Sequence, residues 1–211
     1  MNEIWLIRHG VTRANRLGII QGQSAEPLSS DGREQARKLG RWLAALELEI
    51  DALIASPLAR AAQTAAIIAR HLGVDESSIE SEARLAERSF GDLEGSDTAP
   101  TYRQQAEASD PKSWRPPNGE SFVDLEARAV AGLAAIAERP GERALVVSHG
   151  GPITALVCRA LGMAFEPARF GRVRCDNTGV SVLGRRDRDP RFEMLTINAR
   201  FHLFDVAKAV S

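Results

Sequence analysis

The sequence contains only two cysteines, Cys158 and Cys175, among its 211 residues. Two thiols cannot build the disulfide framework of a small secreted protein, and in a chain of this size they are typical of reduced, unreactive side chains inside the cell. The first residues carry no basic segment, and no apolar run is long enough to cross a bilayer. We therefore expect a cytoplasmic protein without a secretory signal and without a membrane partner.

An excess of charge of either sign is also missing. The 27 basic residues almost balance the 28 acidic ones, which gives a net charge of −1. This balance provides no overall attraction to nucleic acid, so any site for an anion must be local. No linker rich in Pro, Gly or Ser divides the chain, and no segment repeats another. The sequence predicts one domain over residues 1–211 and leaves the oligomeric state open, with a homodimer as one option.

Short apolar runs alternate with stretches whose apolar residues recur at helical spacing. Buried strands are predicted at residues 3–8, 52–55 and 145–147, with two more at 180–183 and 193–197 joined across a charged turn at 185–190. This alternation predicts a three-layer α/β/α fold. Its central sheet is expected to be mostly parallel, with an antiparallel element near the C-terminus.

The intervening segments divide into helices and loops. Helices are predicted from Ser29–Asp31 onward, from Ser56–Pro57 to a stop at Gly73, over 121–138, and over about 152–161. Residues 9–28 are predicted to be a loop. Residues 96–118 are polar and rich in proline, which indicates a lid-like surface excursion.

Two His-Gly pairs follow two of the predicted strands. Arg8 and His9 come after the strand at 3–8, and His149 and Gly150 come after the strand at 145–147. Arg60 lies just inside the helix that follows the strand at 52–55. Because open α/β sheets bind ligands at the carboxyl ends of their strands, we predict that these residues form one composite site.

The residue types in this site indicate phosphoryl chemistry. Arginine presents planar, permanently charged donors that match phosphate oxygens. A neutral imidazole can attack phosphorus without a separate base, and we expect the other ring nitrogen of His9 to donate to the carbonyl of Gly10. Glu87 precedes a glycine-bounded loop at 91–95 and is the candidate acid for the leaving oxygen. No HExxH or paired CxxC motif suggests a metal, and we expect no cofactor.

These residues fall in motifs that resemble the histidine phosphatase superfamily, also called phosphoglycerate-mutase-like. In chain order the motifs are residues 6–10 with Asn15, 27–32, 56–65, 85–95, 119–121 and 147–151. The resemblance implies that His9 is the phosphorylated nucleophile and Glu87 the proton donor. It also implies that Arg8, Arg60 and His149 hold the phosphoryl group while Asn15 touches it. We add Gln21, Gly22 and Gly150 to the expected binding set.

Several of these assignments compete with a structural interpretation. Asn15 could cap a turn, residues 21–22 could form one, and Glu82 and Glu94 compete with Glu87 for the acid role. His71 and His202 are interpreted as structural. Val11 stands where the family usually has Glu or Gln next to the His-Gly pair, and we expect it to affect the choice of substrate at the entrance, together with Arg13 and Gln21.

The resemblance also bears on the branch of the family. Its mutases carry a longer insert with an Arg-Arg pair that grips a substrate carboxylate, whereas residues 96–118 are few and hold only the isolated cations Arg103, Lys112 and Arg115. We therefore predict a metal-independent phosphomonoesterase of the phosphatase branch that acts on a small phosphorylated metabolite. Phosphoglycerate mutase-type transfer is the alternative. An inactive phospho-ligand-binding module is a minor one, because none of the four main site residues is missing.

Overall fold

The strands of the protein form one sheet in a computed structural model that describes residues 1–167, 172–186, 189 and 191–204. The strands are β1 (Glu3–Arg8), β2 (Ala52–Ala55), β3 (Glu80–Ser81), β4 (Arg143–Ser148), β5 (Val180–Gly184) and β6 (Glu193–Ala199), in the order β3-β2-β4-β1-β5-β6. The four strands from β3 to β1 pair in parallel, while β5 and β6 pair antiparallel. The predicted sheet, with its antiparallel element near the C-terminus, is confirmed.

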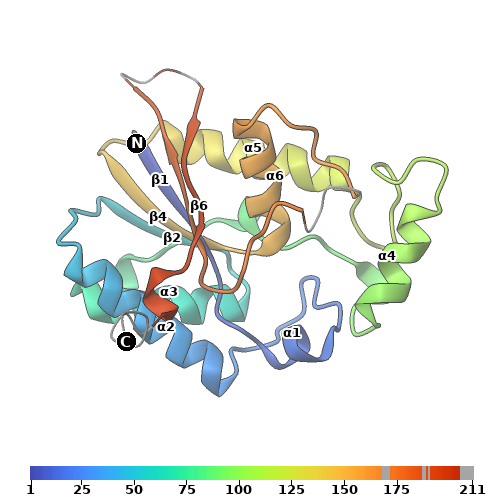
Figure 1. The fold of residues 1–211 in the computed structure, drawn as a ribbon, viewed down its shortest axis with the longest axis horizontal. Helices are drawn as coiled ribbons and strands as arrows, with labels where there is room; N and C mark the ends of the chain where they lie inside the picture. The colour runs from blue at the N-terminus through green and yellow to red at the C-terminus, as the bar shows by residue number, and fades with distance from the viewer. Residues whose placement is uncertain (168–171, 187–188, 190, 205–211) are drawn as a thin grey trace.

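Helices cover both faces of this sheet (Figure 1). One face packs against α2 (Ser30–Ala45) and α3 (Ala59–Leu72), and the other packs against α5 (Phe122–Ala137) and α6 (Gly150–Ala160). Successive residues of a strand point to opposite faces, so Leu145 and Val147 join the first layer while Val146 joins the second. Strand β4 is buried on both faces, which is why its sequence is apolar without alternation. The three-layer prediction is confirmed.

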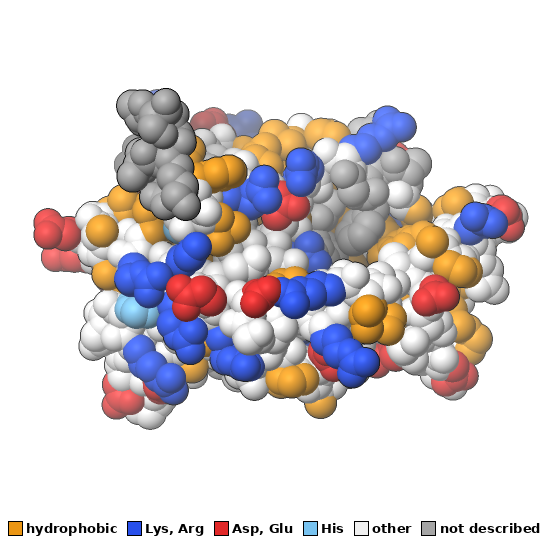
Figure 2. Space-filling view, turned by 60° about the horizontal axis from the view of Figure 1, so that its bottom comes forward, with side chains coloured by type: hydrophobic (Ala, Val, Ile, Leu, Met, Phe, Trp, Pro, Cys, Tyr) orange, Lys and Arg blue, Asp and Glu red, His pale blue; other side chains and the backbone are white. Residues whose placement is uncertain are grey.

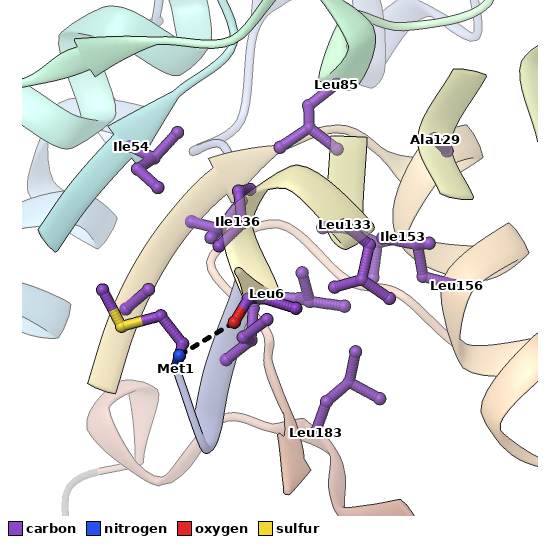
Figure 3. Close-up of a cluster of buried hydrophobic side chains, with 14 of the residues drawn as sticks. Met1, Leu6, Ile54, Leu85, Ala129, Leu133, Ile136, Ile153, Leu156 and Leu183 are labelled. Atoms are coloured by element: carbon purple, nitrogen blue, oxygen red, sulfur yellow. Dashed lines mark hydrogen bonds between the residues drawn. The ribbon is translucent and has the colours of Figure 1, made fainter. Parts of the chain in front are cut away.

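The core on the α5 and α6 side is built from side chains of strands and helices that meet in one cluster (Figure 3). Leu6 and Ile54 come from the sheet, Ile136 comes from α5 and Leu156 from α6, and each of the four is at most 1% exposed. Burying a side chain of this kind stabilises the fold by about 1.5–3 kcal/mol. This packing holds the carboxyl ends of β1, β2 and β4 in fixed relative positions.

Two predicted loops contain helices. Residues 9–28 include α1 (Arg13–Leu17), which begins at a capping box between Thr12 and Asn15 and ends at Gly18 in the left-handed region with φ of 66°. The excursion at 96–118 includes α4 (Thr98–Ala106), which projects beyond the layers at one end of the molecule (Figure 1). Short 3-10 turns lie at Glu76–Ser78, Ala83–Leu85, Gly91–Leu93 and Phe201–Leu203.

Helix starts agree with the sequence where a serine caps the helix. Ser29 accepts a hydrogen bond from the first turn of α2, as predicted, and Ser121 does the same for α5. Helix α3 begins at Ala59 and not at Ser56, and α6 already begins at Gly150 with Pro152 in its first turn, where a missing N–H costs nothing. Of the predicted turn at 185–190, residues 187, 188 and 190 lie outside the described residues.

Charged side chains of both signs are interspersed on the face shown in Figure 2. On α2, for example, Glu34 pairs with Arg37 and Arg41 at 3.0 and 3.2 Å. Exposed pairs of this type contribute little to stability. None of the described helices is long and apolar enough to span a membrane.

Candidate active site

A cavity of about 350 Å³ lies at the carboxyl ends of β1 and β4. The predicted site residues that line it are Arg8, His9, Asn15, Gln21, Gly22, Arg60, Glu87 and Gly150. His149 is fully buried, and its ring centroid lies 5.1 Å from that of His9. The fold therefore brings together residues that are more than a hundred positions apart in the sequence.

His9 follows β1 directly, and its backbone N–H donates to the carbonyl of Ser148 at 3.0 Å. Its side chain is 2% exposed, and its Nδ1 lies 2.7 Å from the carbonyl oxygen of Gly10. Because a carbonyl only accepts, Nδ1 carries the proton and Nε2 keeps a free electron pair. Burial, followed by the nearby charges of Arg8 and Arg60, lowers the pKa of His9 well below its usual value. The expected bond to Gly10 is present, and the ring is neutral near pH 7.

The turn after His9 packs directly on the start of α2. A Cβ atom on Gly10 would lie 2.4 Å from the carbonyl oxygen of Gly32, and one on Gly32 would lie 2.1 Å from that of Val11. Only glycine fits at both positions. Val11 contributes backbone contacts here, since its carbonyl accepts from Ser29. Its side chain is not among those that line the cavity, contrary to its predicted place at the entrance.

His149 is held by a hydroxyl that the sequence did not indicate. Ser56 Oγ lies 2.7 Å from His149 Nε2 and accepts from the backbone N–H of Leu58 at 3.3 Å. In the tautomer that carries the ring proton on Nδ1, the serine hydroxyl donates to Nε2. Burial and the neighbouring His9, Arg60 and Arg8 lower the pKa of His149 well below its usual value, so this ring is also neutral.

The two arginines are fixed by backbone carbonyls at one end of their guanidinium groups. Arg8 Nη1 donates to Cys175 at 2.5 Å, and Arg60 donates to Gly22 at 2.7 Å and Ser24 at 3.1 Å. The hydroxyl of Thr64 accepts from the N–H of Gly10 and donates to the carbonyl of Arg60, which ties this helix to the His9 turn.

Three buried nitrogens at this site have no acceptor among the described residues. They are Nε of Arg8, Nε of Arg60 and Nδ1 of His149. A buried donor without a partner costs about 1–3 kcal/mol. All three nitrogens belong to residues that were predicted from the sequence to bind phosphate.

Glu87 also lines this cavity. Its Oε2 accepts from the N–H of Gly151 at 3.2 Å, and its Oε1 accepts from the N–H of Arg88 at 2.8 Å. The competing carboxylates are engaged elsewhere, since Glu82 pairs with Arg84 and Glu94 accepts from Gln23. Neither of them lines the cavity.

The match between this chain and known proteins decides the family. Residues 4–198 match the histidine phosphatase superfamily (branch 1). The chain belongs to this superfamily. It is 38% identical over 188 residues to a probable phosphoglycerate mutase, GpmB, of Klebsiella pneumoniae, an alignment that covers 86% of this chain and 84% of the relative.

Solved structures agree with this assignment to the histidine phosphatase superfamily. A mycobacterial glucosyl-3-phosphoglycerate phosphatase in complex with VO3 is 27% identical, with a TM-score of 0.77 over 94% of this chain and 100% of that one. A phosphoserine phosphatase from Entamoeba histolytica is 24% identical, with a TM-score of 0.81 over 97% of this chain and 100% of that one. The second likeness shows the fold alone.

In this member of the superfamily, glycine at position 151 lies directly beside the carboxylate of Glu87. A Cβ atom on Gly151 would lie 2.2 Å from Glu87 Oε1. The second glycine after His149 therefore gives the carboxylate room to approach the start of α6. Sequence reasoning placed this residue in a motif without assigning it a role, and the close approach could not be read without the fold.

A partly buried arginine and its carboxylate partner hold the backbone on both sides of Glu87. Arg128 donates to the carbonyls of Arg84, Ala86 and Glu87 at 2.9, 2.6 and 2.8 Å. It also pairs with Glu120, whose Oε2 accepts from the N–H of Ser89 at 2.9 Å. Glu120 stands in a predicted motif, but nothing in the sequence indicated Arg128.

Asn15 combines the two roles considered from the sequence. Its Oδ1 accepts from the N–H of Thr12 in the capping box and from the amide of Asn177 at 3.2 Å, while the residue also lines the cavity. Asn177 in turn donates to the carbonyl of His9 at 2.9 Å, a contact that the sequence did not indicate. Gln21 lines the cavity and accepts from the hydroxyl of Thr12.

The cysteines lie in different surroundings. Cys158 is buried in α6, whereas Cys175 lines the cavity, a position that the sequence did not suggest. Burial raises the pKa of Cys175 to about 12, so the thiol stays protonated. Among the described residues, no group of three or more His, Cys, Asp or Glu side chains is placed to hold a metal ion.

Proposed function

We propose that this protein is a phosphomonoesterase that hydrolyses a small phosphorylated metabolite through a phosphohistidine on His9. The observation that carries the proposal is the cluster of three unpartnered buried donors beside a neutral histidine whose Nε2 is free. Such donors stabilise the charge that spreads over the phosphoryl oxygens in the transition state. Glu87 supplies the carboxyl group that the leaving oxygen needs.

In the first half-reaction, Nε2 of His9 attacks phosphorus in line and the bond to the ester oxygen breaks. Glu87 in its acid form gives its proton to that oxygen, and the alcohol leaves. Arg8, Arg60 and His149 hold the three equatorial oxygens from their Nε, Nε and Nδ1 atoms. Because the two guanidinium groups balance the phosphoryl charge, the proposed mechanism uses no metal. We expect a chelator to leave the rate unchanged.

In the second half-reaction, water attacks the phosphohistidine. Glu87, now a carboxylate, takes a proton from the water as the bond from phosphorus to Nε2 breaks. His9 regains its electron pair, inorganic phosphate leaves, and Glu87 is again an acid. The N–H of Gly151 and the N–H of Arg88 fix the carboxylate in both states.

Phosphoglycerate mutase-type transfer is the second candidate, because the curated relative from Klebsiella carries that name. The contents of the 96–118 segment favour hydrolysis. Lys112 pairs with Glu126 and Arg115 with Asp124, and neither they nor Arg103 line the cavity. A mutase needs cations in its cavity that keep the acid bound between the two transfer steps. These three side chains do not line the cavity.

The test of the phosphohistidine is a rapid-quench experiment with a phosphate ester labelled in its phosphoryl group. Wild-type protein is expected to carry acid-labile, alkali-stable label, and His9→Ala is expected to carry none while it stays folded. His202→Ala, which removes a histidine outside the cavity, serves as the matched control and is expected to label normally. Acid-labile label on His9→Ala would falsify the assignment.

Two further outcomes separate the alternatives. Turnover of phosphoglycerate that depends on bisphosphoglycerate and releases no net phosphate would identify a mutase. Binding of phosphate esters without label and without phosphate release would identify an inactive binding module. We expect net phosphate release without a primer.

A further inference from the structure

The residues that line the cavity include two chemically different sets. One set is His9, Arg8, Arg60 and Glu87, which the proposed function uses for the phosphoryl group. The other set, which we call the apolar wall, consists of Ile20, Phe90, Tyr102 and Val173. These four side chains come from the segment after α1, the turn before Gly91–Leu93, α4 and the segment before β5.

The aromatic part of this wall is preformed. The rings of Phe90 and Tyr102 meet edge to face, with centroids 6.1 Å apart and planes at 78°. Behind them the guanidinium of Arg88 lies 4.8 Å from the Phe90 centroid and donates to Gln105 at 2.9 Å. It also donates to the carbonyl of Trp114, so a buried arginine fastens α4 and the end of the excursion to the wall.

Among the described residues that line the cavity, no charge is left for a second anionic group. Among the described lining residues, the cations are Arg8 and Arg60, and the acidic side chain is Glu87. The phosphoryl group takes up both cations. A carboxylate on the leaving group would lose its hydration against apolar side chains and face Glu87 without a partner, which is unfavourable.

We propose that the substrate is a phosphate ester of an uncharged alcohol that carries an apolar or aromatic face, and that esters whose alcohol bears a carboxylate are poor ligands. This inference rests on the proposed function, which assigns the residues that bind the phosphoryl group. The aromatic or aliphatic face of the leaving group packs on Phe90, Tyr102 and Ile20, as in most small-molecule sites, where apolar walls bury the ligand and a few polar groups orient it.

A binding experiment tests the inference independently of turnover. Calorimetry compares 2-phenylethylphosphonate with 2-carboxyethylphosphonate, which share the phosphonate and the spacer and differ at the distal group. We expect the phenyl compound to bind at least tenfold more tightly. Equal affinity, or tighter binding of the carboxylate, overturns the inference even if the protein hydrolyses phosphate esters.

The same comparison can be made in turnover. Glycerol 3-phosphate and 3-phosphoglycerate differ only by a hydroxymethyl group in place of a carboxylate, and we expect kcat/KM to be at least tenfold higher for the first. If no phosphate ester is hydrolysed, the proposed function fails, while the phosphonate affinities still decide the present inference.

A gain of function provides the sharpest control. Thr98 lines the cavity at the first position of α4 and is partly exposed. Thr98→Arg adds a cation to the wall and is expected to improve the affinity for 2-carboxyethylphosphonate at least tenfold relative to the phenyl compound. Thr98→Met adds similar length without charge and is expected to leave that ratio unchanged or to favour the phenyl compound. Equal ratios in the two variants contradict the argument from charge.

Discussion

At the scale of single residues, Ser56 positions His149 in the proposed mechanism. Its hydroxyl lies 2.7 Å from Nε2, and the proposed mechanism uses Nδ1 as the donor to the phosphoryl group. We predict that Ser56→Ala lowers kcat by about 10–100-fold, the usual cost of losing a residue that orients a site ligand. Steady-state kinetics measures the effect, and Ser56→Thr, which keeps the hydroxyl, is expected to restore most of the rate. Equal losses in both variants would show that the hydroxyl has no such role.

The two buried histidines predict how stability depends on pH. An unfolded histidine has a pKa of about 6.5, whereas burial and the nearby arginines hold the pKa values of His9 and His149 well below that value. As the pH falls below about 6.5, the unfolded chain binds protons that the folded protein refuses, so the free energy of unfolding decreases. The slope is up to about 1.4 kcal/mol per pH unit for each histidine, and the stabilisation is complete above pH 6.5.

Denaturant unfolding between pH 7.5 and 5 measures this slope, since the carboxylates with lowered pKa values titrate at lower pH. Burial and the charge of Arg200 lower the pKa of His202 to about 4, so this partly exposed histidine adds a smaller share. His202→Gln removes that share and leaves the slope due to the other two. A free energy of unfolding that stays constant over this range would contradict the prediction.

Most site residues could be predicted at this scale, and the reason is local. Arg8, His9 and His149 lie at or directly after the ends of apolar runs, so their places follow from the strands alone, and Arg60 follows from the helix that begins after the next strand. No role was predicted for Ser56, Gly151 and Arg128, because the residues that they contact lie far away in the sequence. Their function exists only once β4, α5 and α6 pack together.

At the scale of elements, the segment around Glu87 is the part of the site with the least regular structure. It follows a 3-10 turn at Ala83–Leu85, and Arg128 of α5 holds its carbonyls from one side. We predict that Arg128→Met lowers kcat about 10–100-fold with little change in KM, because a small misplacement of a catalytic group has effects of this size. The pH profile of kcat is recorded as a second readout.

Arg128→Lys gives the matched comparison. Lysine keeps the charge near Glu120 but cannot reproduce the fork that reaches several carbonyls together, so we expect partial recovery of kcat. Thermal unfolding of both variants separates a loss of positioning from a loss of fold. If kcat and its pH profile stay at wild-type values in a folded Arg128→Met protein, the positioning role is wrong.

Elements were predictable where burial dictated the pattern. Strands β1, β2 and β4 are covered by helices, and their apolar runs identified them. Helix α1 has five residues, too short for an apolar period, although Thr12, Asn15 and Gly18 carried its cap signals. Helix α4 has a mostly exposed surface, and its place depends on Arg88 and the aromatic rings rather than on its own sequence.

At the scale of the whole molecule, the site belongs to no single element. Its donors come from β1, α3 and the start of α6, and its acid comes from a segment held by α5. An oxyanion that binds to these donors in the folded protein and not in the unfolded chain stabilises the whole fold and not only the cavity.

This coupling can be measured as a thermal shift with orthovanadate, a phosphate analogue that needs no turnover. At a concentration of about 100 times Kd, a ligand that binds only the folded state stabilises it by about 2.7 kcal/mol. For a chain of this size, that corresponds to a rise in Tm of about 5–10 °C. Arg8→Met removes one of the unpartnered donors and should lose most of the rise, whereas Arg37→Met on the exposed face of α2 should keep it. An equal rise in both variants would mean that the oxyanion binds elsewhere, and that the donors beside His9 do not form the phosphoryl site.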